Sequence, residues 1–492
     1  MNWSDLATAA PVVLAVLVAA AILVVDIALP GRRTPATAVA LVGLAIVAVA
    51  TILLGLSGRQ ETAFGGAYTL DGLTTFLDLL FLAIAALTIL FATDYLAPRG
   101  LPMAEFAAVL VFAVTGAMLV AGSADLLLLF VALELMVLPG YMLAGFARND
   151  PYSTEGAIKY FLLGSFSSAI LLFGLAYVWG TTGSTRISDV AAALAAVASS
   201  HSIQPGLAVG LAFMTTGVAF KMAAVPFHYW TPDAYQGSPT PVTAYLSVGP
   251  KIGAFAIALR LFVGALGPLK ADWLPVVIVL AIATMTLGNL VAITQDNVKR
   301  MLAYSSIAHT GYMLVGLAAF AGGTKGLETQ AIQSVLFYGA AYTFMNMGAF
   351  AVIAALQRRP GVSSQISTFA GLGRRDPWLG ALMALFLLSL TGIPPLAGFW
   401  AKAYVVVAAV QAGGWLTVLA VVAMLNAAAA AFYYLRVVVY MYMREPEGQP
   451  VVSSPGTLFR VGLAATGIVT LVFGLFPAFV TLASNAASAL TS

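Results

Sequence analysis

The chain has 492 residues, of which 61% are hydrophobic and 8% are charged, with a net charge of +3. Soluble domains carry about 25% charged residues, so this composition excludes a water-soluble protein. There is no cysteine, which excludes disulfides and thiolate-bound iron–sulfur clusters within the chain. Only three histidines argue against an internal haem pair, and no glycine-rich nucleotide motif follows a strand.

The apolar runs are long enough for membrane-spanning helices, which need about 20 residues each. In chain order we predict fourteen spans, near residues 6–29, 36–56, 72–94, 103–122, 124–147, 157–180, 205–228, 241–266, 273–294, 300–321, 329–356, 379–411, 415–440 and 459–484. The predicted fold class is therefore an all-α polytopic membrane protein.

Two of these spans are irregular. The seventh contains Pro226 and leads into the turn-rich stretch TPDAYQGSPTP, and the twelfth contains Gly392, Pro394 and Pro395. Proline removes an amide donor and clashes with the preceding turn. We therefore predict that helices 7 and 12 are discontinuous.

The distribution of Lys and Arg between loops predicts the orientation, because cytoplasmic loops carry the excess. With the N-terminus outside, the cytoplasmic side holds thirteen: Arg32, Arg33, Arg99, Arg148, Lys159, Lys299, Arg300, Arg358, Arg359, Arg374, Arg375, Arg444 and Arg460. The outer side then holds four, namely Arg59, Arg186, Lys270 and Lys325. Thirteen against four predicts that both termini face outward.

Spans 4–8 and 9–13 form two blocks of five, and because five is odd the second block enters from the opposite side. The fourth span of each block carries a lysine, Lys221 or Lys402, beside a proline break. This pattern predicts two inverted five-helix repeats with a transport site at the broken helices. We divide the chain into residues 1–100 (helices 1–3), 101–270 (first repeat), 271–445 (second repeat) and 446–492 (helix 14).

Among the ionisable residues inside predicted spans, five are candidates for a function: Glu134, Lys221, Lys251, His309 and Lys402. A charge at bilayer depth costs about 2.5–3.5 kcal/mol on insertion scales, so something must offset it. In one interpretation the lysines snorkel to the interface, Lys251 directly after a helix break predicted at Gly249-Pro250, while Glu134 forms a structural ion pair and His309 packs as a neutral ring. In the other, these groups and water form a proton relay, with a Glu–Lys pair controlling the charge of the lysine.

Other ionisable residues lie near span ends. His228 and Asp233 flank the break after span 7 and are candidates for lining an entrance from the cytoplasm, although the aromatic stretch 228–230 equally fits an interfacial belt. For the remaining ones, interface anchoring is the expectation; they are Asp26, Asp78, Arg260 and Arg436.

Four stretches carry a resemblance to a known family. They are IKYFLLGSFSSAILLFGLAYVWGTTGST (158–185), KMAAVPFHYWTPDAYQGSPTPVTAYLSVGPK (221–251), NVKRMLAYSSIAHTGYMLVGL (297–317) and FLLSLTGIPPLAGFWAKAYV (386–405). Together they resemble the antiporter-like membrane subunits of the proton-pumping NADH–quinone oxidoreductases, respiratory complex I, and among these subunit N. The lysine at 402 disfavours subunit M, and the short segment after span 14 disfavours subunit L.

The resemblance implies roles for single residues. Glu134 resembles the span-5 glutamate of the family and Lys221 the span-7 lysine that pairs with it. Lys251 resembles the span-8 relay residue, and Lys402 the span-12 lysine near the outward half of the path. His309 and His228 are further candidates from their position alone.

The resemblance also implies the setting. The chain would hold no cofactor itself, and NADH, FMN, iron–sulfur clusters and quinone would belong to the other membrane-arm and peripheral-arm subunits. It would lie in the bacterial inner membrane and bind no nucleic acid. The expected function is proton translocation coupled to quinone reduction elsewhere in the complex. The alternative is a hydrophobic subunit of a multisubunit cation/proton antiporter, which genomic context or co-purification would distinguish.

Overall fold

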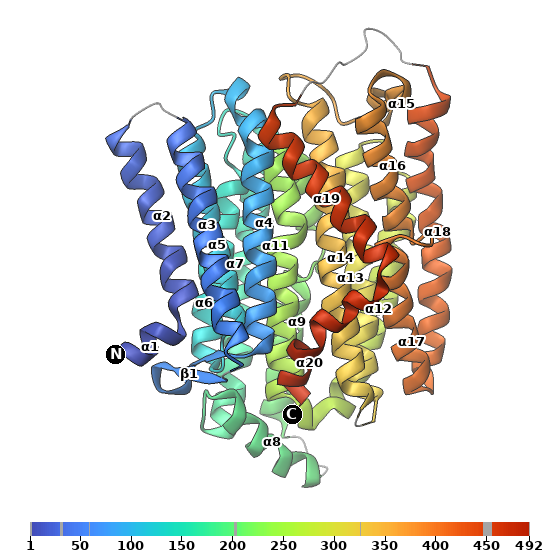
Figure 1. The fold of residues 1–492 in the computed structure, drawn as a ribbon. Helices are drawn as coiled ribbons and strands as arrows, with labels where there is room; N and C mark the ends of the chain where they lie inside the picture. Colours follow the sequence, from blue (N-terminus) through green and yellow to red (C-terminus); the bar gives the residue numbers. More distant parts are fainter. Residues whose placement is uncertain are drawn as a thin grey trace.

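The computed structural model describes residues 2–29, 33–58, 60–200, 204–324, 326–445 and 455–491. Long helices run side by side in one bundle, and both termini lie at the same end of it (Figure 1). We call this the terminus end, and the other the opposite end. Arg32, Arg59 and Lys325, used in the charge count, lie outside the described residues, and so does the stretch 446–454 at the last predicted division.

The elements follow one another along the chain with few long connections. In order they are α1 (Trp3–Thr8), α2 (Ala10–Ala28), α3 (Arg33–Leu56), β1 (Glu61–Ala63), η1 (Phe64–Gly66), β2 (Tyr68–Leu70), α4 (Gly72–Leu96), η2 (Ala97–Arg99), α5 (Met103–Ala121), α6 (Leu126–Ala144), α7 (Pro151–Thr182), α8 (Ile187–Ser200), α9 (Pro205–Lys221), α10 (Trp230–Gly237), α11 (Thr240–Ala258), the π-helical η3 (Leu259–Ala265), η4 (Gly267–Leu269), α12 (Lys270–Ile293), α13 (Val298–Gly322), α14 (Leu327–Leu356), η5 (Ile366–Phe369), α15 (Leu372–Arg375), α16 (Pro377–Thr391), α17 (Ala397–Ala412), α18 (Trp415–Met443), α19 (Thr457–Leu475), η6 (Pro477–Ala483) and α20 (Ser484–Thr491).

Within the described part of the chain, eleven helices are long and apolar enough to cross a membrane. They confirm an all-helical membrane protein. The other predicted spans correspond to α9, α13 and the α16–α17 pair, of which α9, α16 and α17 are shorter. The apolar stretch of α11 is wholly buried and that of α14 nearly so, whereas α2 and α3 at the edge expose most of theirs. Polar chemistry on α11 and α14 is therefore shielded from lipid.

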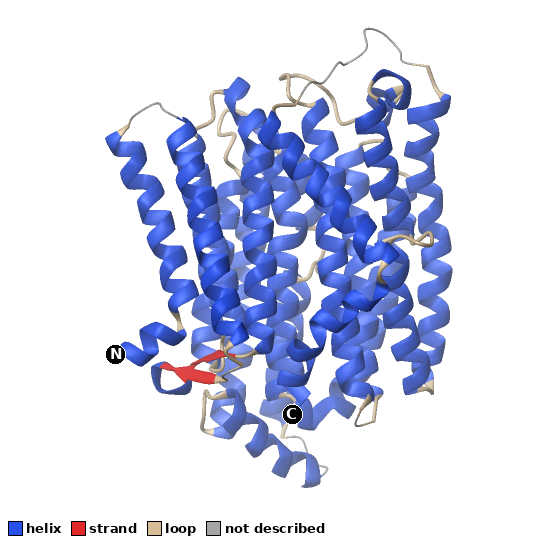
Figure 2. Ribbon diagram, viewed as in Figure 1, coloured by secondary structure: helices blue, strands red, loops and turns tan. Residues whose placement is uncertain are grey.

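A short antiparallel hairpin is the exception to the helical pattern. Strands β1 and β2 pair with Glu61 opposite Leu70, and the hairpin lies at the terminus end (Figure 2). The sequence does not predict a strand here. Three-residue strands are too short to leave a readable alternation of apolar and polar residues.

Side-chain caps fix where several helices begin. Asp125 accepts from Leu127 N at 2.8 Å at the start of α6, and Asp150 accepts from Tyr152 N at 3.0 Å at the start of α7. Asn297 does the same for α13. These caps use amide donors that would otherwise be unpaired, and they set which helix face each later residue occupies.

Both predicted helix breaks are present. Helix α9 ends at Lys221, and the chain becomes helical again only at α10. Helix α16 ends at Thr391 and is followed by Gly392, whose φ of 94° lies in the left-handed region that favours glycine. The chain is helical again from Ala397. Two half-helices thus end inside the bundle rather than at its surface.

A third predicted break is wrong. The Gly249-Pro250 pair was expected to interrupt the helix before Lys251, but Pro250 lies inside a continuous α11. A proline at this position leaves the carbonyl of Leu246, four residues earlier, without its amide donor. The Tyr235 hydroxyl donates to that carbonyl at 3.0 Å, which compensates for the missing bond.

Candidate functional site

Lys221 ends α9 in a buried polar pocket, with only 5% of its surface exposed. Its Nζ donates to Ser168 Oγ at 2.9 Å and to the Gly164 carbonyl at 3.1 Å, both on α7. A longer contact of 3.4 Å reaches the Tyr141 hydroxyl on α6. The lysine is therefore held by neutral oxygen atoms inside the bundle, and it does not snorkel to the interface.

Glu134 lies two helical turns before Tyr141 on α6, on the same face. It is half-buried, and its Oε1 has no hydrogen-bond partner. Among the described residues, no ion pair joins Glu134 directly to Lys221. The carboxyl still acts electrostatically on both Lys221 and Tyr141. Tyr141 is thus the side chain common to the acid and the lysine.

Lys251 on α11 is also buried, and its Nζ donates to two groups of α13. One is the Ser306 carbonyl and the other is Thr310 Oγ1 at 2.8 Å. Thr310 Oγ1 in turn donates to the Met222 carbonyl at 2.8 Å. Met222 directly follows Lys221, so a single hydroxyl connects Lys251 to the end of α9.

His309, on α13, lies beyond Lys251. Its Nδ1 is 2.6 Å from the Tyr338 hydroxyl, and its Nε2 is 3.2 Å from the Tyr434 hydroxyl. Lys251 and Lys402 are both close enough to act on the imidazole electrostatically. His309 therefore occupies the interval between the second lysine and the third.

Lys402 on α17 binds the end of the preceding half-helix. Its Nζ donates to the carbonyls of Leu390 at 2.9 Å and Thr391 at 2.7 Å. These lie four residues before Pro394 and Pro395, so they are the carbonyls that the two prolines leave without amide donors. The Lys402 ammonium group thus donates to two carbonyls that lack backbone donors, and these carbonyls satisfy the buried lysine in turn.

The break after α9 is satisfied in a similar way. Pro226 would leave the Met222 carbonyl unpaired, and Thr310 donates to it. The Val225 amide donates to Thr284 Oγ1 at 3.0 Å. Irregular backbone at membrane depth is tolerated where neighbouring side chains satisfy its hydrogen bonds. Thr310 does so here. It belongs to what we call the polar series, which consists of Glu134, Lys221, Lys251, His309, Lys402 and the hydroxyl side chains that bond to them.

Several buried polar atoms on α11, α13 and α14 have no hydrogen-bond partner among the described residues. They are the hydroxyls of Tyr245, Ser306 and Tyr342 and the amide oxygen of Asn346. The Tyr342 ring lies 5.9 Å from the Lys251 Nζ. Buried polar groups are normally paired with protein or ordered water, so this region has capacity for water beside the lysine.

His228 does not join this series. It is buried in the segment between α9 and α10, stacks on Tyr229 at 4.7 Å and approaches Tyr304 at 6.5 Å, while its Nδ1 has no partner. Nearby Asp233 accepts from Lys159 and Arg300, each at 2.7 Å. Partial burial alone would raise the pKa of the Asp233 carboxyl, but the two hydrogen bonds outweigh burial and hold this pKa below its usual range.

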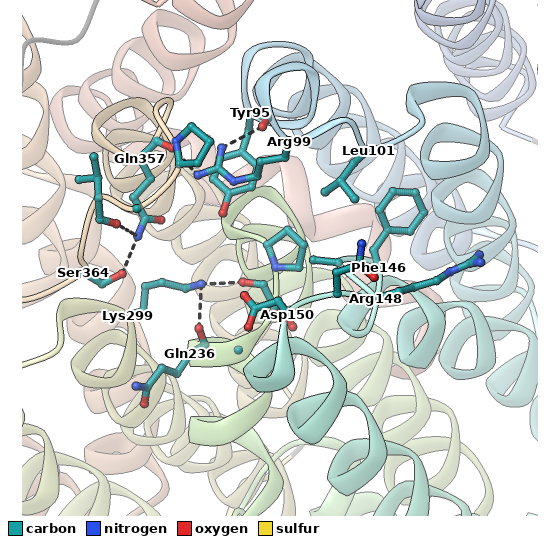
Figure 3. Close-up of a pocket in the computed structure, with 18 of the residues that line it drawn as sticks. Tyr95, Arg99, Leu101, Phe146, Arg148, Asp150, Gln236, Lys299, Gln357 and Ser364 are labelled. Carbon is teal, nitrogen blue, oxygen red and sulfur yellow. Dashed lines mark hydrogen bonds between the residues drawn. The ribbon is translucent and has the colours of Figure 1, made fainter. Parts of the chain in front are cut away.

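A separate pocket lies at the opposite end of the bundle (Figure 1), and Figure 3 shows residues that line it. Its volume is about 690 Å³, and none of the six predicted site residues lines it. Lys299 Nζ donates to the carbonyls of Ser238 at 2.6 Å and Gln236 at 3.1 Å, while Arg99 donates to the Gln357 carbonyl at 2.6 Å. The pocket is polar, and α11 and α13 both begin at it before running inward to Lys251 and His309.

Two of the residues expected to anchor the interface are not at an interface. Asp78 is 0% exposed and Arg260 is 6% exposed. Both lie near the ends of predicted spans, but neighbouring helices bury their side chains. Arg260 also forms an ion pair with Asp71 at 2.8 Å.

Sequence reasoning missed the neutral partners of the charged residues. Tyr141, Ser168, Thr310, Tyr338 and Tyr434 each contact a predicted site residue. Hydroxyl side chains are common in spanning helices and bond readily to their own backbone. Only Thr310 could have been singled out from the sequence, because it directly follows the predicted site residue His309.

Comparison with known proteins gives the family. The family described as NADH:quinone oxidoreductase/Mrp antiporter, TM, matches residues 123–426. NADH-quinone oxidoreductase subunit N 1 of Koribacter versatilis is 42% identical over 487 residues, covering 97% of this chain and 94% of that protein. Subunit N of Trichlorobacter lovleyi is 42% identical over 425 residues, covering 86% of this chain and 85% of its own.

Comparison with solved structures gives matches of the same kind. A chain of respiratory complex I from Thermus thermophilus with bound aureothin is 33% identical, with a TM-score of 0.79, covering 97% of this chain and 99% of that one. A chain of the Mrp complex from Dietzia sp. is 23% identical, covers 100% of this chain and 98% of its own, and has a TM-score of 0.82, which shows a shared fold. The chain therefore belongs to the family of antiporter-like membrane subunits of NADH-quinone oxidoreductase, with subunit N among its relatives.

Proposed function

We propose that this chain is a proton-translocating membrane subunit of an NADH–quinone oxidoreductase. Protons would move along Glu134, Lys221, Lys251, His309 and Lys402, with water completing the steps. The chain itself would perform no redox chemistry. Its part in the enzyme would be to couple quinone reduction in other subunits to proton movement across the membrane.

The observation that supports the proposal is the succession of buried ionisable and polar groups through the bundle. Glu134 acts on Lys221, the Met222 carbonyl and Thr310 connect the end of α9 to Lys251, and His309 lies between Lys251 and Lys402. A purely structural role would need only paired charges. Buried ionisable residues in spanning helices are expensive, and proton relays are a principal reason for keeping them.

The bonding of the lysines also suits exchange of a proton. Each of the three lysines donates to neutral oxygens, and none is paired directly with a carboxylate among the described residues. A lysine that is held by carbonyls and hydroxyls can lose its proton without leaving a buried, unpaired carboxylate. A nearby acid can then bias the lysine electrostatically as its own charge or position changes.

The membrane topology forms part of the proposal. We propose fourteen spans containing two inverted five-helix repeats, residues 101–270 and 271–445, with both termini on the outer side of a bacterial inner membrane. Both termini lie at one end of the bundle, which supports an even number of crossings (Figure 1). The lysines would then form a line parallel to the membrane, so that each step crosses little of the membrane potential.

The partners are proposed from the relatives. Subunits of the membrane arm and the peripheral arm would surround the chain, and NADH, FMN, iron–sulfur clusters and quinone would be bound by them. The cation/proton antiporter alternative is disfavoured, because a subunit N relative is 42% identical over 97% of this chain, whereas likeness to the Mrp chain is a likeness of fold at 23% identity. Co-purification of the native chain with NADH-oxidising subunits, as opposed to other antiporter subunits, decides between the two.

The proposal is tested by proton release from sealed vesicles that contain the assembled complex. We expect protons to be moved on addition of NADH and a soluble quinone, and we expect Lys402→Ala to reduce the number moved per quinone. An unchanged number in a fully assembled Lys402→Ala complex would remove this chain from the proton path.

A further inference from the structure

A second buried charge cluster lies toward the terminus end, outside the polar series described above. Asp71 caps α4 by accepting from Thr74 N at 2.8 Å, and it binds Arg260 through two bonds of 2.8 and 3.0 Å. Arg260 also donates to the Ala121 carbonyl and to Thr74 Oγ1. Each member of this ion pair has its hydrogen-bonding needs met, so Asp71 and Arg260 have a clear structural role.

Asp78 differs from them. It lies on the same face of α4 as Asp71 and Thr74, at helical positions i+7 and i+4 from these two. It is 0% exposed, and neither carboxyl oxygen has a hydrogen-bond partner among the described residues. An unpaired carboxyl this deep is costly and rare in native proteins, so its retention calls for a role that its present contacts do not supply.

The Arg260 guanidinium is the positive charge that acts on Asp78. Asp71 and Arg260 are the charged side chains that act on it electrostatically, and Asp78 in turn acts on the Tyr68 hydroxyl, which also lacks a partner. Two carboxyls therefore interact electrostatically with one guanidinium. Asp71 holds it in this structure, and an ionised Asp78 would compete for it because opposite charges attract strongly away from water.

The backbone that carries Arg260 is unusual. Arg260 lies in η3, a π-helical continuation of α11, and π-helical turns recur at functional sites. The same continuous helix carries Lys251, nine residues earlier and therefore about 14 Å away along the axis. The guanidinium is thus mounted on the helix that bears the central lysine of the polar series.

Between Lys251 and the cluster the packing is apolar. A cavity of about 10 Å³ is lined by Leu77 and Leu80 of α4 and by Ile252 and Phe255 of α11, among others. This volume is about that of one water, so the region is closed to continuous proton flow in this conformation. A pump requires such a barrier, since its central groups must never open to both faces together.

We propose, building on the proposed function, that Asp78 is a proton-carrying residue on the outward side of this subunit and that Arg260 is its positioning residue. A proton binds one Asp78 oxygen when it arrives from the interior, which forms a neutral acid while the Asp71–Arg260 pair stays intact. When that O–H bond breaks, the proton leaves toward Tyr68 and the terminus end, and Arg260 turns from Asp71 to the new carboxylate. The guanidinium keeps its charge throughout, so one proton enters and one leaves.

The test is infrared difference spectroscopy on the assembled complex in lipid vesicles, with turnover started by NADH and quinone. We expect a band from the C=O stretch of a neutral carboxyl to change during turnover, to be lost in Asp78→Asn and to return, shifted, in Asp78→Glu. Proton release to the outer side should be lost in Asp78→Asn but not in the control variant. Thr88→Val is the matched control, because Thr88 is equally buried on α4 but bonds only to its own helix, at the Ile84 carbonyl.

A wild-type spectrum whose neutral-carboxyl bands are all retained in Asp78→Asn would overturn the proposal, as would full proton release by that variant. Arg260→Lys keeps the charge but loses the forked geometry, and we expect it to shift the Asp78 band. The same vesicles with Lys221→Ala separate the two ideas. Pumping lost with Lys221→Ala but retained with Asp78→Asn rejects only the Asp78 proposal, whereas pumping retained in both rejects the proposed function.

Discussion

Lys251 and Thr310 are joined by a hydrogen bond of 2.8 Å, and the same threonine hydroxyl donates at 2.8 Å to the Met222 carbonyl at the broken end of α9. The hydroxyl therefore accepts from one lysine and binds the backbone next to another. A hydroxyl that accepts and donates at once can pass a proton along by rotating. Thr310 is thus the single side chain through which hydrogen bonds link Lys251 to the end of α9.

Replacing Thr310 with valine keeps the shape and removes the hydroxyl. We expect Thr310→Val to slow proton transfer between Lys221 and Lys251 and to lower the protons moved per quinone. It leaves the Met222 carbonyl unpaired, at a cost to stability of about 1–3 kcal/mol. The measurement is proton uptake and release by vesicles containing the assembled complex.

Thr343→Val provides the comparison for Thr310→Val. Thr343 is equally buried, but its hydroxyl bonds only to the Gly339 carbonyl of its own helix. If both variants lose the same amount of pumping, the effect comes from the loss of a buried hydroxyl in general and the special position of Thr310 is refuted.

Lys221→Ala tests the interior lysine beside Glu134. We expect quinone-coupled pumping to fall by about 10²-fold, the lower range for loss of a proton-transferring side chain, while the complex still assembles. Lys221→Arg should restore the charge without restoring pumping, because arginine is effectively never deprotonated in proteins. Full activity of the arginine variant would mean that Lys221 acts only as a fixed charge.

The positions of the charged residues could be read from the sequence because charge is rare in an apolar chain. Lys221, Lys251 and Lys402 stand out against their neighbours, and the prolines at 226, 394 and 395 located the two breaks. Pro250 gave a wrong prediction because the compensating Tyr235 hydroxyl comes from another helix. A contact of that kind has no local signature.

The same limit applies to the finer geometry of the site. The sequence predicts Glu134 and Lys221 within ion-pair distance or through one water, and it gives no indication that Ser168 and Gly164 of α7 would be the direct partners of Lys221. For Asp78, nearness to a span end suggested an exposed anchor, and only tertiary packing reveals its burial. Sequence gives the depth of a residue along its own helix, whereas the partners depend on how helices rotate against one another.

The sequence left two interpretations open for His309, a neutral ring that only packs or a member of the proton relay. Tyr338→Phe removes the hydroxyl 2.6 Å from Nδ1 and keeps the ring. If His309 exchanges a proton, we expect pumping to fall several-fold and its pH profile to shift, since a hydrogen bond to the imidazole is lost. An unaltered rate and profile would assign His309 to packing. Tyr404→Phe, which loses a bond to the Pro477 carbonyl near the bundle surface, is the control.

Asp233 gives a prediction for stability against pH. Its pKa is held below the usual range in the folded chain, so its contribution is fully present above the unfolded pKa of about 3.9 and is lost as pH falls through the folded value. We expect Asp233→Asn to lower the melting temperature of the complex at pH 7, through about 1 kcal/mol of partly screened ion pairing. The difference from wild type should shrink below pH 4, and a difference that grows there would contradict the assignment.

The central claim is that protons pass through the series Glu134–Lys221–Lys251–Lys402. Lys251 lies in its middle, so Lys251→Ala interrupts the series without removing either end. The decisive measurement is the number of protons moved per quinone reduced by the assembled Lys251→Ala complex in sealed vesicles, beside Lys270→Ala, which removes a lysine paired with Glu328 away from the series. The account predicts a clear loss in Lys251→Ala and none in Lys270→Ala. Undiminished pumping by a fully assembled Lys251→Ala complex would contradict it.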